Sequence, residues 1–125
     1  MRCTNKHVLE KDIQRGIMDL LCIYGINFWR QNQGNISIND KFGMPTRRFM
    51  AARDQRGRAV KGISDIIGIL NDGKFLAIEV KRPGNKPTPD QITFIENINK
   101  NNGLAFVAYS VDDVQNILRR EGYVK

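Results

Sequence analysis

Two short apolar segments joined by a tight turn limit the fold of this chain more than any other feature of its sequence. Asp65–Leu70 and Phe75–Lys81 are rich in isoleucine, leucine and valine, the composition of buried strands. Between them, Asn71–Lys74 reads Asn-Asp-Gly-Lys, which is typical of a hairpin turn. We therefore expect an antiparallel hairpin, and with three residues in the turn Leu70 would pair with Lys74.

A helix and a further strand are predicted directly after this hairpin. Thr88 suits the N-cap, Pro89 suits the first helical position, and Gln91 completes a capping box. The helix that begins at Thr88 is expected to end at Gly103. Leu104–Tyr109 then has the apolar composition of a buried strand. A strand–helix–strand unit of this kind makes its two strands parallel, with a right-handed crossover.

The remaining segments add helices at both ends of the chain and short strands near its start. Apolar residues recur at helical spacing from about Asn5 to Tyr24. The order α-β-β-β-β-α-β-α predicts an α/β fold with a central mixed β-sheet flanked by helices, in a single domain over residues 1–125. The other expected elements are the strand Ile26–Asn32, the strand Arg47–Ala52 and a last helix capped by Ser110 and Asp113. Gly34–Pro45 is loop-like and leaves room for a short strand at Asn35–Ile38, which the order does not count.

The charge of the chain favours a polyanionic partner. It carries 20 lysines and arginines against 13 acids, a net charge of +7. Seven of the basic residues fall between Lys41 and Lys61, where Asp54 is the one acid. Such a surface suits nucleic acid through contacts with phosphates. A solvated basic loop explains the charge alone equally well.

The numbers of histidines and cysteines limit the kinds of metal site and disulfide that the chain can form. His7 is the only histidine, which excludes a paired-histidine metal site and leaves carboxylates and carbonyls as ligands. Oxygen ligands favour Mg²⁺ or Mn²⁺. The cysteines do not predict a disulfide scaffold, and Cys22 is expected in the core. The sequence shows no apolar span and no signal peptide, so we expect a cytoplasmic protein.

Three charged residues, Asp65, Glu79 and Lys81, lie on the two predicted strands of the hairpin. Alternation along a strand puts Glu79 and Lys81 on one face. If the turn has three residues, Asp65 lies opposite Glu79, whereas a four-residue turn would place Asp65 beside Val80. Taken separately, Asp65 is explained as a cap at a strand start, and Glu79 with Lys81 as an exposed ion pair.

Taken together, these residues favour a catalytic metal site. Two facing carboxylates repel each other, and a divalent cation removes that repulsion. The metal would polarise a phosphate and activate water, with the Val80 carbonyl as a further ligand. Lys81 would orient the water or help to deprotonate it, and would offset charge at the phosphate.

An ordered set of short motifs covers most of the chain. Ser64-Asp65 stands where a nuclease motif has Pro-Asp, and Glu79-Val80-Lys81 matches its E-x-K. The set resembles the PD-(D/E)XK nuclease superfamily and, within it, the VRR-NUC family, particularly small stand-alone members of phage type. The other matching pieces are Glu10-x-x-x-Gln14, Trp29-Arg30-Gln31-Asn32, Gly62 to Gly68, Ala77 to Lys81, and Thr88-x-x-Gln91.

The resemblance implies a restriction-endonuclease-like core and a role for each matching residue. Asp65, Glu79 and the backbone carbonyl of Val80 would bind the metal, and Lys81 would be the catalytic lysine. Glu10 would reach the metal through water and take part in catalysis. Without the resemblance, Glu10 is explained by its favourable interaction with the helix dipole.

Gln91 would be a further catalytic residue at the edge of the active site, although its capping-box role explains it nearly as well. Gln14 and Arg30 are secondary candidates. Gln14 lies one turn after Glu10 on the same helix face.

The resemblance also implies a metal-dependent, structure-selective endonuclease that cuts branched DNA such as Holliday junctions. A homodimer suits such a junction, because its two equivalent strands each need an active site. The alternatives are a restriction-type or nicking endonuclease on duplex DNA, and a non-catalytic DNA-binding module with a nuclease-like fold. A phage-encoded protein would act in the host-cell cytoplasm. The residues expected to contact the DNA backbone are Arg47, Arg48, Arg53, Arg56, Arg58, Arg82 and Lys86.

Overall fold

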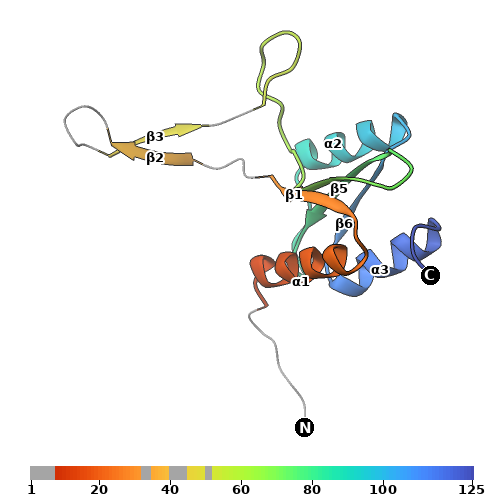
Figure 1. Cartoon of the computed structure of the whole chain (residues 1–125). Coiled ribbons are helices and arrows are strands. Elements are labelled where there is room, and N and C mark those ends of the chain that lie inside the picture. The colour runs from red at the N-terminus through yellow and green to blue at the C-terminus, as the bar shows by residue number, and fades with distance from the viewer. Residues whose placement is uncertain (1–7, 32–34, 40–44, 50–51) are drawn as a thin grey trace.

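The computed structural model describes residues 8–31, 35–39, 45–49 and 52–125, with the backbone alone for the two strands in 35–49. Its centre is a four-stranded sheet in the order β1-β4-β5-β6 (Figure 1). β1, β4 and β5 are antiparallel neighbours, and β6 runs parallel to β5, as predicted for the crossover unit. The strands are β1 (Asn27–Arg30), β4 (Ile66–Ile69), β5 (Phe75–Val80) and β6 (Leu104–Ala108).

The β4–β5 hairpin has the register of a three-residue turn. Ile66 lies opposite Ile78, and the Leu70 N–H donates to the Lys74 carbonyl at 2.9 Å. The shifted register of a four-residue turn is therefore excluded. Continued by one residue, the observed register places the residue before β4 opposite Glu79.

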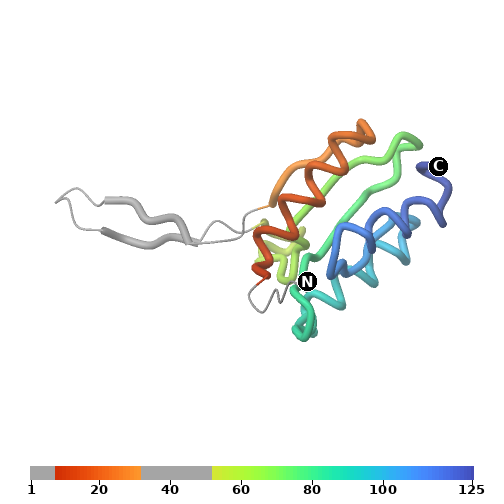
Figure 2. The backbone as a smooth tube through the Cα atoms, turned by 90° about the horizontal axis from the view of Figure 1, so that it is seen from below, coloured from red at the N-terminus to blue at the C-terminus, as the bar shows by residue number. Residues whose placement is uncertain are grey.

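Helices cover both faces of this sheet. α1 (Glu10–Ile23) and α3 (Val111–Arg120) pack on one face and contact each other, lying side by side in Figure 2. α2 (Pro89–Lys100) packs on the other face against β5 and β6. The α/β architecture with a mixed sheet flanked by helices is thus confirmed.

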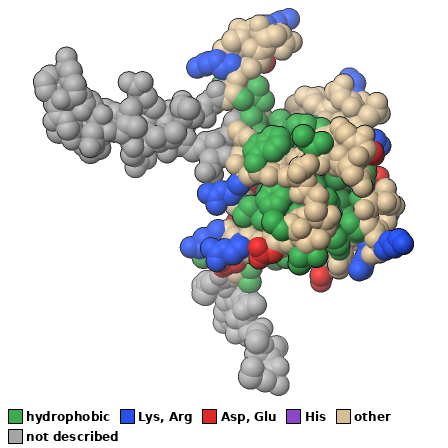
Figure 3. Space-filling model, viewed as in Figure 1, with side chains coloured by type: hydrophobic (Ala, Val, Ile, Leu, Met, Phe, Trp, Pro, Cys, Tyr) green, Lys and Arg blue, Asp and Glu red, His purple; other side chains and the backbone are tan. Residues whose placement is uncertain are grey.

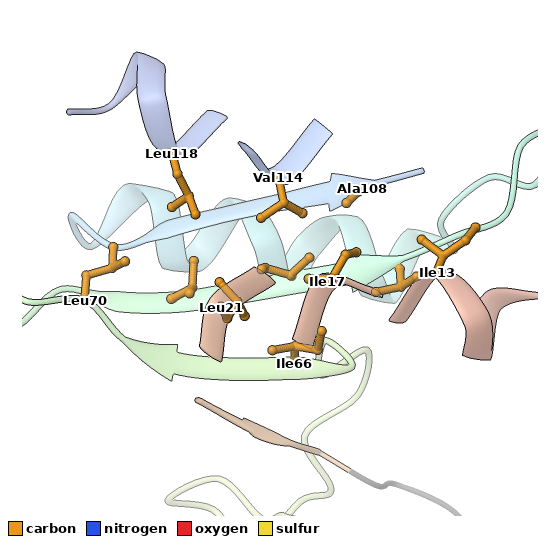
Figure 4. Packing of buried hydrophobic residues seen from close by; sticks show 11 residues of the cluster. Ile13, Ile17, Leu21, Ile66, Leu70, Ala108, Val114 and Leu118 are labelled. Atoms are coloured by element: carbon orange, nitrogen blue, oxygen red, sulfur yellow. The ribbon is translucent and has the colours of Figure 1, made fainter. Parts of the chain in front are cut away.

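The main core lies between the sheet and the layer formed by α1 and α3. Ile17 and Leu21 of α1 and Val114 and Leu118 of α3 are fully buried there (Figure 4). Along β5, Leu76, Ile78 and Val80 join this cluster, whereas Ala77 joins a smaller cluster beneath α2. Because side chains alternate along a strand, the odd-numbered residues of β5 face α2.

Two expectations about α1 are wrong. The helix begins at Glu10 rather than near Asn5; Leu9 is its N-cap, with extended backbone, and residues 5–7 lie outside the described part. Cys22 is exposed, not in the core. The buried stripe includes Leu21, and the next residue points about 100° further round the helix axis.

The predicted short strand at 35–38 is present as β2 (Asn35–Asn39), which pairs antiparallel with β3 (Pro45–Phe49) in a separate sheet. β3 starts two residues before the expected strand Arg47–Ala52, of which residues 50 and 51 lie outside the described part. Arg47 and Arg48 lie on β3, but their side chains are outside the described part of the chain. Among the described residues, no helix has both the length and the apolar character needed to cross a membrane.

Candidate active site

The candidate site lies at the end of β5, between the first turns of α1 and α2. Its centre is Glu79, the next-to-last residue of β5, which is 2% exposed. An acid at such a position loses the hydration of its charged form. The groups around this one carboxylate therefore determine the chemistry of the site.

Asp65 lies directly before β4, and its side chain adds a hydrogen bond to the last part of β5. Its Oδ2 accepts the Val80 N–H at 2.9 Å, just beyond the paired residues of β4. Its carbonyl oxygen accepts the Gln31 N–H at 2.7 Å, and Gln31 Oε1 accepts the indole N–H of Trp29 at 3.1 Å. Hydrogen bonds on both sides thus hold Asp65 next to Glu79.

The neighbourhood makes Glu79 a weak acid. Burial has the largest effect, and the neighbouring carboxylate of Asp65 adds to it, raising the pKa of Glu79 to about 8. The charge of Lys81 opposes this rise, and the charge of Glu10 adds to it. At neutral pH the pair of carboxyls therefore holds a proton, in a place that a divalent cation can take.

Lys81 directly follows β5 and lies beside the same carboxylate. Its Nζ is 3.9 Å from Glu79 Oε2, and its side chain is 14% exposed. The backbone N–H of Lys81 donates to the Ala108 carbonyl at 3.0 Å, which continues the pairing with β6. The backbone pairing thus fixes the position of the Lys81 Cα, while the side chain stays partly exposed.

Gln91 makes both of the interactions that the sequence left as alternatives. Its Oε1 accepts the Thr88 N–H at 2.8 Å, and its own N–H donates to Thr88 Oγ1 at 3.2 Å, forming the predicted capping box. Its Nε2 donates to Glu79 Oε2 at 3.1 Å. Because the capping box occupies the amide oxygen, the amide nitrogen faces Glu79.

Glu10 approaches from the opposite helical layer as the first residue of α1. Its Oε2 accepts a hydrogen bond from Asn85 Nδ2 at 3.4 Å, and its negative charge helps to raise the pKa of Glu79. Gln14 lies one turn further along α1, and Arg30 ends β1 opposite Ile66. The structure thus brings Glu10 near the two carboxylates and joins it to the loop that follows β5.

A close contact that the sequence analysis did not single out joins this site to α2. Gly62 has a φ of +74°, and a Cβ at this position would lie 2.3 Å from the Asp90 carbonyl carbon and 2.6 Å from Gln91 N. Only glycine permits this approach. The glycine three residues before Asp65 was the available signal, and the structure shows that it brings the Asp65 segment against the first turn of α2.

The donor atoms fit a small divalent cation. Glu79 Oε1 is buried and has no hydrogen-bond partner among the described residues, which is costly for a carboxylate oxygen. Asp65 and the Val80 carbonyl are further oxygen ligands of the kind that Mg²⁺ and Mn²⁺ prefer. No three His, Cys, Asp or Glu side chains of the described chain are grouped closely enough to hold an ion. A metal here would therefore need the backbone carbonyl or water to complete its ligands.

The loop between residues 52 and 62 carries part of the predicted basic surface. Arg53 and Ala59 form a β-bridge across it. Asp54 folds the loop: its Oδ1 accepts the N–H groups of Arg56 and Arg58 at 2.9 Å each, and its Oδ2 lies 3.0 Å from Arg58 Nε. The three arginines are exposed, and Figure 3 shows basic side chains on this projecting loop.

Two further predicted basic residues lie on the other connection of the site. Arg82 and Lys86 are exposed in the loop between β5 and α2. This loop also carries Asn85, the partner of Glu10. Basic side chains are therefore present both before β4 and after β5, the two strands that carry or adjoin the carboxylates.

Comparisons with known proteins agree with the fold. The sequence model of the VRR-NUC domain matches residues 10–112, a span that includes every residue of the candidate site. A solved structure described as a VRR-NUC domain is 22% identical, with a TM-score of 0.58, and the alignment covers 92% of this chain and 97% of that one. At this identity the likeness concerns the fold. No curated protein matches the chain.

Proposed function

Because the chain belongs to the VRR-NUC family, whose domains are of nuclease type and act on DNA, we propose that it is a Mg²⁺- or Mn²⁺-dependent endonuclease. It hydrolyses phosphodiester bonds, and its substrate is branched DNA such as Holliday junctions. The observation that carries the proposal is the buried Glu79, which lies beside a second carboxylate, Asp65, and whose Oε1 has no hydrogen-bond partner in the described part of the chain. A strongly perturbed acid pair is poorly suited to stability and well suited to catalysis.

In this proposal Asp65, Glu79 and the Val80 carbonyl hold the metal, and Glu10 reaches it through water. When bound, the ion lowers the pKa of water and polarises the phosphate. Gln91 donates to Glu79 Oε2, and no described residue donates to Oε1. Oε1 is therefore the oxygen that we expect to bind the metal. The proton of Glu79 is released to solvent when the cation replaces it.

Lys81 acts beside these ligands. Its ammonium group orients the attacking water and offsets the negative charge that builds up on the phosphate. The 3.9 Å separation from Glu79 supports this role, since it keeps the cation at the site without binding the carboxylate tightly.

Branched DNA and a homodimer belong together in the proposal. Each chain carries one set of these residues, while a four-way junction has two equivalent strands to cut, so a twofold-symmetric pair supplies both sites. Contacts with phosphates position the DNA without reading its sequence. The residues proposed for these contacts are Arg47, Arg48, Arg53, Arg56, Arg58, Arg82 and Lys86.

A cleavage assay on a panel of end-labelled substrates tests this function. We expect a four-way junction to be cut with Mg²⁺ or Mn²⁺ and to stay intact with EDTA. Asp65→Ala and Glu79→Ala should abolish cleavage but still bind the junction in a gel-shift assay. Glu96→Ala, which removes an exposed acid of α2, should cut like the parent.

Other outcomes identify the alternatives. Cleavage confined to linear duplex would indicate a restriction-type or nicking enzyme. Junction binding with no cleavage in either metal would indicate a non-catalytic module. A Glu79→Ala variant as active as the parent would contradict the proposed mechanism.

A further inference from the structure

A groove runs between the basic loop and α2. One wall includes Arg58, Val60 and Lys61, and the other includes Thr93 and Asn97 of α2. Its volume is about 710 Å³. In Figure 3 the surface is hollowed between the projecting loop and the lobe that α2 forms.

A second hollow, of about 350 Å³, continues the first along α2. The two share Val60, Phe94 and Asn97, so they form one continuous groove. The second part adds Phe75 and Ile98, together with Asn101 and Gly103 at the end of the helix.

One end of the groove lies next to the candidate active site. Asp90 lines this end, and the next residue, Gln91, contacts Glu79. From Asp90 to Asn101, near the far end, α2 rises about 16 Å at about 1.5 Å per residue. The groove therefore leads away from the proposed cleavage centre along the length of the helix.

The chemistry of the lining changes along this path. Arg58 and Lys61 are cationic, whereas the far part offers two aromatic rings and the amide of Asn101. Phe75 is 42% exposed, although it lies on the sheet face that α2 covers. A stretch that presents Arg58 and Lys61, followed by the exposed ring of Phe75 and the partly buried ring of Phe94, suits a ligand with a charged backbone and flat bases, which is a single nucleic-acid strand.

We propose that this groove binds an unpaired segment of the DNA strand next to the cleavage site. Phosphates lie near Lys61, and bases stack on Phe75 and Phe94. Duplex DNA has its bases already stacked and paired, so it gains nothing from these rings. The proposal rests on the proposed nuclease function, because it specifies a part of the same substrate.

Two acids, Asp54 and Asp90, also line the groove and match Arg58 and Lys61 in number, so the positive excess of this region comes from other arginines of the same loop. The carboxylate of Asp54 is engaged by Arg58 and by backbone N–H groups of the loop. Asp90 lies in the first turn of α2, where an acid interacts favourably with the helix dipole. Arg53 and Arg56 add further positive charge on the same loop.

Filter binding in EDTA tests the proposal without any cleavage. The probes are an end-labelled oligothymidine of about 10 nucleotides and a duplex of the same length. Phe75→Ala should weaken oligothymidine binding about fivefold or more, because it removes a stacking ring. Asn97→Ala should weaken it as well, because Asn97 lines both parts of the groove. Ile92→Ala is the matched control, since Ile92 is 43% exposed on α2 but lies outside the groove, and it should bind like the parent. Thermal unfolding checks each variant, and the exposed Asn97 provides a test that does not depend on the folding of Phe75→Ala.

The inference is overturned if Phe75→Ala and Asn97→Ala bind oligothymidine as tightly as Ile92→Ala does, or if the parent binds the duplex at least as tightly as the single strand. These results are independent of catalysis. If the parent cleaves junctions but fails the binding test, the proposed nuclease function stands and the groove proposal is wrong. If the parent passes the binding test but never cleaves, the groove proposal stands and the nuclease function is wrong.

Discussion

The side-chain amide of Gln91 donates to Glu79 Oε2 at 3.1 Å, so one residue of the α2 capping box also contacts the buried acid of β5. The start of the helix and the centre of the candidate site are therefore not independent. A change in the cap alters which group faces Glu79, and this coupling can be separated from stability by experiment.

Thr88→Val should lower cleavage by more than its loss of stability explains. The variant removes the hydroxyl that accepts the Gln91 N–H, so the cap weakens by about 1 kcal/mol and the Gln91 side chain is held less firmly. Ser110→Ala is the matched control, because Ser110 caps α3 through the Asp113 N–H at 3.1 Å. Both variants should lose similar melting temperature, but only Thr88→Val should lose kcat, and Thr88→Ser should restore it. Equal kcat in Thr88→Val and Ser110→Ala would contradict the coupling.

The metal-free protein should become less stable as the pH rises from about 4.5 to about 8. The pKa of Glu79 rises from its ordinary value of 4.5 to about 8 in the folded protein, so folding favours the protonated form. The stabilisation that Glu79 contributes to folding is complete below its pKa in the unfolded chain. It is lost as the pH approaches its pKa in the folded protein. Since one pKa unit corresponds to about 1.4 kcal/mol, the loss amounts to several kcal/mol.

Glu79→Gln should remove most of this pH dependence, and chemical denaturation across the pH range in EDTA measures it. Glu96→Gln, an exposed position on α2, should keep the profile of the parent. A parent whose unfolding free energy is flat between pH 5 and pH 8, with EDTA present, would show that Glu79 does not carry the proton assigned to it.

Gly62→Ala should be far more damaging than Gly57→Ala. Both glycines have positive φ, +74° and +77°, so alanine is strained at either position by about 1–2 kcal/mol. Only at Gly62 would the new methyl group collide with backbone atoms of α2, whereas at Gly57 nothing lies within 4 Å. Thermal unfolding should show the larger loss for Gly62→Ala, with cleavage reduced as well. Similar melting temperatures for the two variants would argue against the close contact.

Asp65→Asn should separate the structural role of Asp65 from its proposed role in metal binding. The amide oxygen can still accept the Val80 N–H, which Asp65 Oδ2 accepts at 2.9 Å, but the negative charge is gone. We expect a melting temperature close to that of the parent, no cleavage, and weaker binding of Mn²⁺ in calorimetry. Asp65→Ala also removes the acceptor, so it should melt lower than Asp65→Asn. Full activity of Asp65→Asn would exclude Asp65 as a metal ligand.

Much of the fold could be predicted because it follows from local rules. The turn at 71–73 sets the register of the hairpin, and the register brings Asp65 to Glu79. Thr88 and Gln91 predict the start of α2, because a capping box involves only residues close in sequence. The start of α1 was missed, since apolar periodicity continued upstream of Glu10 while the backbone at Leu9 is extended.

The parts of the site that could not be predicted depend on contacts between distant segments. Nothing local shows that Asn85 meets Glu10, or that Gly62 lies against Asp90. The sequence offered capping and a place at the edge of the active site as competing explanations of Gln91. An amide has a donor end and an acceptor end, so one side chain both caps α2 and contacts Glu79. Burial of Glu79, which determines its pKa, emerges only when α2 is packed on the sheet.

Trp29 is the only tryptophan of the chain, and its indole N–H is bonded to Gln31, whose backbone N–H is bonded to the carbonyl of Asp65. Two hydrogen bonds therefore connect the protein's dominant fluorophore to a proposed metal ligand. Because the indole is also partly exposed, its emission responds to changes in its surroundings. The protein thus carries an intrinsic optical reporter at one edge of its sheet, with which occupation of the site can be followed in the unlabelled chain.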